Sequence, residues 1–368
     1  MGWITTWAVI VDGRDASSAM NDWLRSIEVQ EKEGGGGDTA SLEFDDTGGE
    51  VYLPPAGTRV QILLDDVQKF DGYTEEPEWH FARNGGRTFS IHCTAHDSRG
   101  AVKDPQHWHQ DGGTLQDFLG RAAKEAGIAS VRIAPAFAAM ARSWWSPSGA
   151  SFLQLGRRLA TELGGVFRIR GDQAILAERG SGTSVSGTEL PPVVFDCNDE
   201  TVASVSGSPF TGHQSRTRAK VTWFDREQGK PRSEEVEIEP LDGAPESIAQ
   251  GRWRRPNADG AKGAAKGRKN AAEHDKGNLT VKTDLRVGVS VGCPATLVNA
   301  RPGIDGAYKV KSATHRLARS GGGTSDFSIA RPEGKAGKDG RSKRSAAGSA
   351  KAPAGVQEAG AVPATPVA

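Results

Sequence analysis

The chain has 368 residues, enough for two or three domains, and its 46 Lys and Arg residues balance its 46 Asp and Glu residues. A net charge of zero favours no class of partner. Three widely spaced cysteines do not support a disulfide framework or a zinc site, and no apolar run is long enough to cross a bilayer. The charge is uneven, however: residues 1–80 hold 17 acidic and 5 basic residues, a balance of −12 that leaves +12 for the rest. This pattern predicts opposed faces that attract copies of the chain or neighbouring proteins, although ordinary scatter of surface charge gives the same count.

The first part of the chain predicts short strands. From Trp7 to Asp97, apolar and polar residues alternate in segments that end at Gly-, Asp- and Asn-rich turns. The start of the chain shows no signal peptide, and its alternation favours a strand over a lipidated terminus. Short strands with hairpin turns are typical of a small sandwich or barrel, and residues 1–103 are predicted to form a first, tube-like β-barrel domain. The predicted strands are residues 8–15, 25–33, 39–46, 58–66, 67–76 and 87–96.

The apolar period then changes to that of helices. Thr114 can cap a helix that stops at Gly127, and Ser148 or Ser151 can open a second helix that closes at Gly164. Residues 104–190 are therefore predicted to be a small α+β insertion domain. Its other elements are an extended segment at residues 131–137 and a two-stranded ribbon at residues 166–178, which turns at Gly171-Asp172.

Strand patterns return after a Ser- and Gly-rich break, so residues 191–332 are predicted to form a second β-barrel domain. An Ala- and Lys-rich stretch at residues 247–274 interrupts them and is predicted to be helical, although its glycines weaken that assignment. Residues 333–368 lack large apolar side chains and are predicted to be a disordered tail. The predicted strands are residues 201–207, 219–225, 234–240, 277–288, 295–299, 308–317 and 325–332.

The two predicted β domains share a motif. Residues 71–91 and residues 305–329 both read Asp-Gly, a nearby Tyr, a His, a Gly pair and Phe-Ser-Ile. Each copy is predicted to be strand, Asp-Gly turn, strand, Gly-rich turn and strand, although hairpins of unrelated proteins share this composition. We interpret the repeat as two versions of one barrel, so that three copies of the chain would place six barrels in a ring. Such a ring fits a hexamer on one side and a threefold object on the other, and pairing between barrels would cover exposed strand edges.

Ordered motifs across all three predicted domains resemble the phage late control D proteins, the central hub of contractile-tail baseplates. The resemblance covers about residues 5–332. The opening strands contribute VDGRDAS, LRSIEVQEKEG, LPPAGTRVQI and FDGYTEE, the middle contributes TLQDFLGRAAKEAGI and SFLQLGRRLATELGGVFRI, and the closing strands contribute GCPATLVN and IDGAYKVKSATHRL.

The resemblance implies a structural protein and not an enzyme. It implies a homotrimer that joins a tail tube or tube-initiator protein to a central spike, contacts other baseplate proteins, and leaves a channel through which DNA passes without specific binding. We expect it in the virion tail after assembly in the host cytoplasm, whose reducing conditions suit three unpaired cysteines. The alternatives are a tail-associated peptidoglycan hydrolase and the hub part of a type VI secretion spike protein. The second alternative carries a long repetitive β-helical segment that does not follow here.

The sequence predicts no catalytic residue, no cofactor and no metal site. His92 and His96 would share the strand face opposite Phe89, Ile91 and Cys93, a solvent or interface side, so surface or packing roles are favoured over metal binding. His80 and His315 occupy matching places in the repeat, which predicts a shared structural role such as bonding a turn carbonyl. The other candidate ligands, in a predicted loop, are His107 and His109.

Three acidic clusters could supply the paired carboxylates of a glycosidase, but they fall at predicted hairpin turns without a pocket-building context. P-loop, GxSxG and HExxH motifs are absent from the sequence. Residues 252–269 and residues 331–351 hold seven Lys and Arg residues each. The first region is predicted to contact protein, and the second to be an arm that reaches a spike or baseplate protein. The acidic clusters are Asp45-Asp46, Asp65-Asp66 and Glu75-Glu76 with Glu78.

Overall fold

The computed structural model of the chain is mainly β with few helices. It describes residues 5–34, 37–83, 86–180, 182, 188–208, 216–225, 227–238, 245–251, 254–255, 258–274, 277–333 and 336. Apart from residues 333 and 336, the predicted tail lies outside the described residues, as does most of the second basic region.

We call the regions of residues 1–103, 104–190 and 191–332 the first half, the middle region and the second half. The first half contains the predicted strands. Their apolar residues alternate inward, as in β4 (Thr39–Asp45), where every second residue is buried. The hairpin between β5 and β6 turns at Asp65-Asp66, both with left-handed backbones. The other elements are β1 (Trp7–Val11), β2 (Arg14–Asp15), α1 (Ser17–Met20), β3 (Leu24–Lys32), β5 (Arg59–Leu64), β6 (Val67–Thr74), β7 (Glu78–Ala82), β8 (Gly86–Thr94) and η1 (Ala101–Lys103).

The predicted helix starts of the middle region are confirmed. Thr114 caps α2 (Leu115–Glu125) by accepting a hydrogen bond from the Asp117 amide, and the Asp117 carboxylate accepts one from the Thr114 amide. Ser151 caps α4 (Phe152–Leu163) in the same way. The ribbon is also confirmed, but residues 135–138 form a short helix because Pro135 occupies its first turn. The remaining elements are β9 (Gln110–Asp111), β10 (Ser130–Ile133), α3 (Pro135–Ala138), β11 (Trp144–Trp145), β12 (Gly165–Arg170) and β13 (Gln173–Glu178).

The second half adds a second set of strands and one long helix, α5 (Ala258–His274). The predicted helix began too early, since residues 248–250 form a strand. Gly267 lies where α5 meets the end of α4: a Cβ there would come within 2.7 Å of the Gly164 amide nitrogen. The strands are β14 (Val193–Asp196), β15 (Val202–Ser208), β16 (Arg218–Asp225), β17 (Lys230–Glu237), β18 (Ile248–Gln250), β19 (Asn278–Asp284), β20 (Pro294–Val298), β21 (Gly306–Ala318) and β22 (Gly322–Glu333).

The two halves pair their strands in the same order. The first half runs β3-β4-β8-β6-β5-β1, and the second runs β15-β19-β22-β21-β20-β14. Strands in the same place of the two lists also follow one another in the same order along the chain, so that β3 corresponds to β15, β4 to β19 and β8 to β22. The match ends at the last pair, because β1 is antiparallel to β5 whereas β14 is parallel to β20. The repeat read in the sequence thus reflects a repeated strand topology.

The predicted Asp-Gly turns are wrong. Asp71-Gly72 lies inside β6, where a Cβ on Gly72 would come within 2.1 Å of the Thr94 carbonyl oxygen. This glycine therefore permits close approach of β6 and β8 and does not bend the chain. Likewise, Gly306 opens β21 instead of forming a turn.

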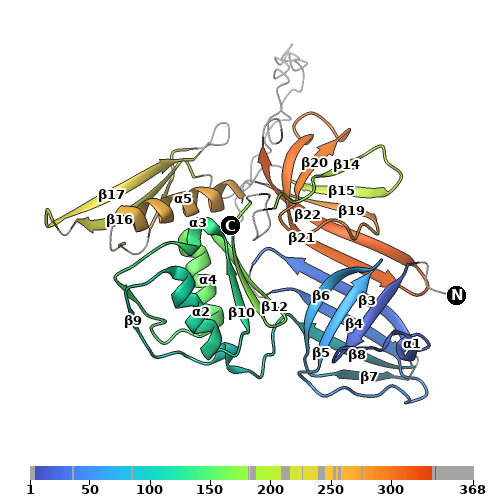
Figure 1. Cartoon of the computed structure of the whole chain (residues 1–368). Helices are drawn as coiled ribbons and strands as arrows, with labels where there is room; N and C mark the ends of the chain where they lie inside the picture. Colours follow the sequence, from blue (N-terminus) through green and yellow to red (C-terminus); the bar gives the residue numbers. More distant parts are fainter. Residues whose placement is uncertain are drawn as a thin grey trace, which may run out of the picture.

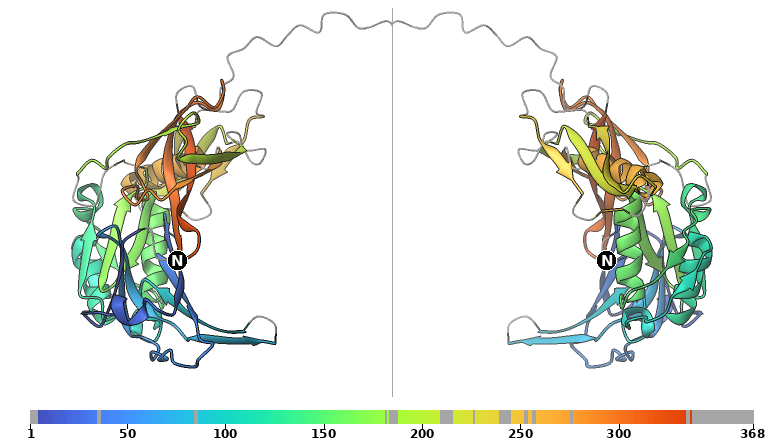
Figure 2. Two further views of the ribbon diagram at one scale, coloured as in Figure 1. Left: turned by 90° about the vertical axis from the view of Figure 1, so that its right-hand side faces the viewer. Right: turned by 90° about the vertical axis from the view of Figure 1, so that its left-hand side faces the viewer.

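The two closed barrels are not confirmed. Among the described residues no sheet closes on itself; instead, β3 pairs with β21, and this contact joins both halves into one 14-stranded sheet (Figure 1). We call the contact, residues 26–32 against residues 312–318, the seam. The chain curves, and the hairpin of β7 and β8 projects to the same side as the ribbon of β16 and β17 (Figure 2).

Candidate functional site

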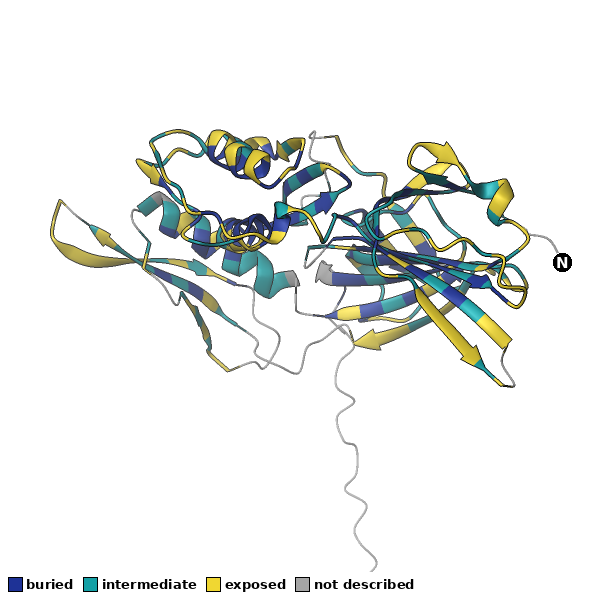
Figure 3. Cartoon of the chain, turned by 90° about the horizontal axis from the view of Figure 1, so that it is seen from below, coloured by how far each residue is buried: buried dark blue, intermediate teal, exposed yellow. Residues whose placement is uncertain are grey.

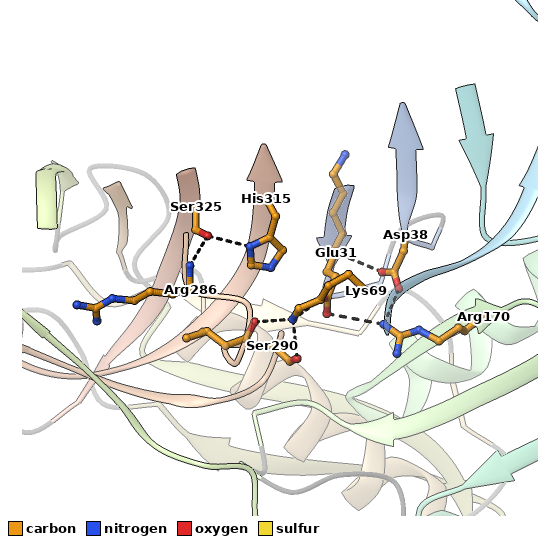
Figure 4. Close-up of polar contacts among 10 residues, drawn as sticks. Glu31, Asp38, Lys69, Arg170, Arg286, Ser290, His315 and Ser325 are labelled. Carbon is orange, nitrogen blue, oxygen red and sulfur yellow. Dashed lines mark hydrogen bonds and ion pairs between the residues drawn. The ribbon is translucent and has the colours of Figure 1, made fainter. Parts of the chain in front are cut away.

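A buried ion pair lies where the two halves meet the middle region. Lys69 on β6 and Glu31 on β3 are each 1% exposed, with Lys69 Nζ 3.1 Å from Glu31 Oε1. Lys69 also donates to the Val289 carbonyl at 3.0 Å and to the Ser290 hydroxyl at 3.4 Å (Figure 4). A single ammonium group therefore contacts both halves of the chain, with its three donors satisfied.

A second pair attaches the middle region to this cluster. Arg170 on β12 lies 3.2 Å from the carboxylate of buried Asp38 and 3.8 Å from that of Glu31. Burial raises the pKa of Asp38, while the neighbouring Arg168 and Arg170 oppose that change. We call Glu31, Asp38, Lys69 and Arg170 the junction cluster.

His315 lies in the same part of the structure and is fully buried on β21. Its Nδ1 lies 2.9 Å from the Ser325 hydroxyl, which accepts a hydrogen bond from the Arg286 amide (Figure 4). Burial, with a smaller effect of the Lys69 charge, lowers the pKa of His315 to about 3, so the imidazole is neutral.

The arrangement suits a structural joint better than a reaction centre. Both carboxylates of the junction cluster are engaged by basic side chains. Removing one partner of such a buried pair is costly, whereas the intact pair favours one arrangement of the parts that supply it. The cluster therefore fixes three segments of the chain relative to one another.

The predicted histidine roles need correction. His92 is exposed, as expected, 3.7 Å from Glu78, but His96 is buried, and neither of its ring nitrogens has a hydrogen-bond partner. The alternation fails because β8 ends at Thr94, so His96 no longer follows the strand. Burial lowers the pKa of His96.

The shared role predicted for His80 and His315 is also wrong. His80 is exposed on β7, whereas His315 is buried and contacts a serine hydroxyl instead of a turn carbonyl. The strand register shows why: when Phe89 is aligned with Phe327, the residue equivalent to His80 is Thr314, one residue before His315. His107 and His109 are exposed, and across the described residues no group of three or more His, Cys, Asp and Glu side chains could hold a metal.

The acidic clusters support turns and loops. Asp45 accepts hydrogen bonds from Thr47, and buried Asp46 accepts one from the Trp79 indole at 3.1 Å. Glu75 accepts a hydrogen bond from Ser98 at 3.1 Å. These contacts use the carboxylates structurally and do not pair them across a pocket.

The junction cluster is what the sequence reading missed. Its signal is Lys69 next to Phe70 in β6, a charge at a position that the strand buries. The partner could not be read from the sequence, because Glu31 and Asp38 lie more than thirty residues away.

Exposed strand edges provide candidate interaction surfaces. Trp79 and Phe81 on β7 are 56% and 59% exposed, and their rings stack with centroids 6.3 Å apart. In the described part of the chain β7 pairs with β8 alone, β15 with β19 alone, and β17 with β16 alone. Exposed residues cover the projecting hairpins, while buried residues line the sheets (Figure 3). Such edges are ready to pair with another strand.

Membrane insertion by a helix is not indicated: none of the described helices combines the length and apolarity that a bilayer span requires.

Comparisons with known proteins agree with the sequence resemblance. The chain is 22% identical over 199 residues to the probable baseplate hub protein of Escherichia phage P2, a match that covers 52% of this chain and 50% of the relative. The chain thus matches about half the length of this relative. No family model matches the chain.

Solved structures share the fold. A tail protein from Neisseria meningitidis has a TM-score of 0.67 at 14% identity, covering 89% of this chain and 96% of its own. A 43 kDa tail protein of a Shewanella oneidensis prophage has a TM-score of 0.66 at 12% identity, covering 89% and 98%. An E. coli component of the type VI secretion system has a TM-score of 0.53 at 11% identity, covering 86% and 75%. The chain therefore resembles phage tail and baseplate hub proteins.

Proposed function

We propose that the chain is a non-enzymatic hub of a contractile phage tail or phage-like particle. Three copies form a ring that joins the hexameric tail tube, or its initiator protein, to a trimeric central spike, with a channel for the passing DNA. Residues 1–103 and 191–332 form the ring and residues 104–190 the insertion. The hub also contacts other baseplate proteins, and it assembles in the host cytoplasm before it becomes part of the virion.

The observation that carries this proposal is the matched strand order of the two halves. A chain with two topologically equivalent halves presents six similar units in a trimer, which suits a joint between sixfold and threefold partners. The similarity to the P2 hub protein supports the same function.

The seam offers a template for the contact between copies. Within one chain, the outer strand β3 of the first half pairs with β21 of the second. In the strand order, β15 is the equivalent of β3. The part of β21 that meets β3 is the equivalent of β7, because it pairs with the Phe-Ser-Ile strand of the second half, β22, as β7 pairs with that of the first half, β8. We infer that β15 of one copy adds to β7 of the next, which repeats the seam and covers both edges.

The register follows from the same equivalence. Arg316 pairs with Glu28 across the seam. With Phe89 aligned with Phe327, Ala82 is the equivalent of Arg316, and Ser208 is the equivalent of Glu28. Ala82 of one copy should therefore lie opposite Ser208 of the next.

The test combines native mass measurement with disulfide trapping. In a Cys197→Ser background, Ala82→Cys with Ser208→Cys should give a disulfide-linked trimer. Directly opposed strand residues bring Cβ atoms within about 5.5 Å, close to disulfide geometry. Buried Cys93, whose pKa burial raises to about 12, should not interfere.

The control pairs Ala82→Cys with Ser204→Cys, which lies four residues along the same strand, about 13 Å away. A trimer without the specific cross-link would overturn the strand register and leave the hub proposal standing. A chain that stays monomeric, even with its spike partner present, would overturn the ring.

A hub of a type VI secretion device is the second candidate. The fold likeness to the E. coli secretion component favours it over the peptidoglycan hydrolase. Electron microscopy of purified particles separates the two hub assignments, since only a phage-like particle carries this chain at the end of a tail with a head or a free sheath.

A further inference from the structure

A pocket of about 450 Å³ opens on the middle region, away from the seam and the junction cluster. It lies between β11, α4 and the segment that precedes α5. Its size is within the range of small-ligand sites. The lining residues that matter here are Arg142, Trp144, Trp145, Arg158, Glu162 and Arg255.

The pocket lining carries more positive than negative charge. Glu162 Oε1 accepts a hydrogen bond from Arg142 at 2.7 Å and forms an ion pair with Arg255 Nη1 at 2.8 Å. Arg158 is exposed and donates to two backbone carbonyls at 3.3 Å. The pocket lining thus holds three guanidinium groups and one carboxylate.

An exposed aromatic ring stands beside these arginines. Trp145 is buried, donates to the Gly113 carbonyl and carries the Arg142 guanidinium 4.4 Å from its ring centre. Trp144, the next residue along β11, is 54% exposed. Trp and Arg at the rim of one pocket are the residue types that dominate binding energy at protein interfaces.

We propose that this pocket binds an acidic peptide segment of a partner protein. A carboxylate of the segment pairs with Arg158 and the outer faces of Arg142 and Arg255, and a neighbouring apolar side chain packs on Trp144. Glu162 already neutralises part of the arginine charge, which suits a singly charged carboxylate better than a phosphate. One exposed ring also differs from the row of aromatic residues that stacks single-stranded bases. The inference rests on the proposed function only for the source of the segment, a neighbouring tail protein.

The experiment selects a random dodecapeptide phage-display library against the full chain and measures the affinity of the recovered peptides by fluorescence anisotropy. Peptides with Asp or Glu next to an apolar residue should be enriched. Arg158→Gln and Trp144→Ala should each weaken their binding about tenfold, the scale expected for one charge-assisted hydrogen bond or one interface anchor.

Arg157→Gln is the matched control, because it removes the same charge from the neighbouring position of α4, outside the pocket lining, and should leave affinity unchanged. Selection without acidic enrichment, or acidic peptides that bind Arg158→Gln as well as the unaltered chain, would overturn the proposal. Displacement of the peptides by a single-stranded oligonucleotide at lower concentration than by free acidic peptide would also overturn it. None of these results depends on trimer formation, so they are separate from the test of the hub.

Discussion

Lys69 contacts residues of both halves of the chain through one buried side chain. Its ammonium group is buried, pairs with Glu31 and donates to the loop that follows β19. An ion in this position is tolerated only because its partners replace the lost water. The contacts of this one side chain therefore join the first half to the second.

Replacement of Lys69 by Met tests this role. Lys69→Met removes the cation that contacts buried Glu31 at 3.1 Å and leaves it only Arg170 at 3.8 Å, and we expect a loss of about 3–5 kcal/mol in the free energy of unfolding. The measurement is chemical denaturation at neutral pH. Lys69→Met combined with Glu31→Leu should recover most of the loss, and equal destabilisation by both variants would contradict a charge-based cause.

His315 predicts a loss of stability in acid. Its pKa is about 3 in the folded chain and about 6.5 in the unfolded chain, so the unfolded state binds the extra proton between these values. Stability should fall as the pH drops below 6.5, by up to about 1.4 kcal/mol per pH unit from this group. Buried His96, whose pKa is also lowered, acts in the same direction, whereas Asp38, whose pKa is raised, acts in the opposite direction.

The comparison that isolates His315 is denaturation of the unaltered chain and of His315→Gln from pH 7 to pH 4. The pH dependence should be weaker in the variant, while His92→Gln, at an exposed position, should leave it unchanged. Parallel curves for all three proteins would refute the assignment.

At the scale of elements, two glycines on neighbouring helices have opposite roles. Gly120 in α2 has open space where the methyl group of an alanine would stand, whereas a Cβ on Gly156 in α4 would lie 2.4 Å from the Phe167 ring. Gly120→Ala should raise the free energy of unfolding by about 0.5–1 kcal/mol, because alanine favours the helix. Gly156→Ala should lower it by about 1–3 kcal/mol through overpacking.

Thermal or chemical unfolding of the two single variants checks this pair. Stabilisation by Gly156→Ala would show that α4 can move away from β12 at little cost.

At the scale of the whole molecule, the seam should be among the last parts to open. It is continuous with the apolar cores of both halves, and Leu317 packs into the core of the first half. The ribbon of β16 and β17 rests on a small cluster around Val221 and Ala265. Local opening needs less free energy where fewer apolar contacts are broken.

Hydrogen exchange followed by mass spectrometry measures this difference. Amides of residues 312–318 should exchange at the rate of global unfolding, and those of residues 230–237 should exchange much faster. Similar protection in both segments would mean that the ribbon unfolds together with the sheet.

The sequence by itself determined most of the strands, both capped helices and the repeated motif, because alternation, capping residues and turn formers act over a few neighbouring residues. It also indicated the resemblance to hub proteins. Only the tertiary structure decided that Gly72 lies within a strand, that His96 and His315 are buried, and that β3 pairs with β21. These features depend on contacts between residues far apart in the chain, and the partners of Lys69, 38 and 220 residues away, leave no local pattern that identifies them.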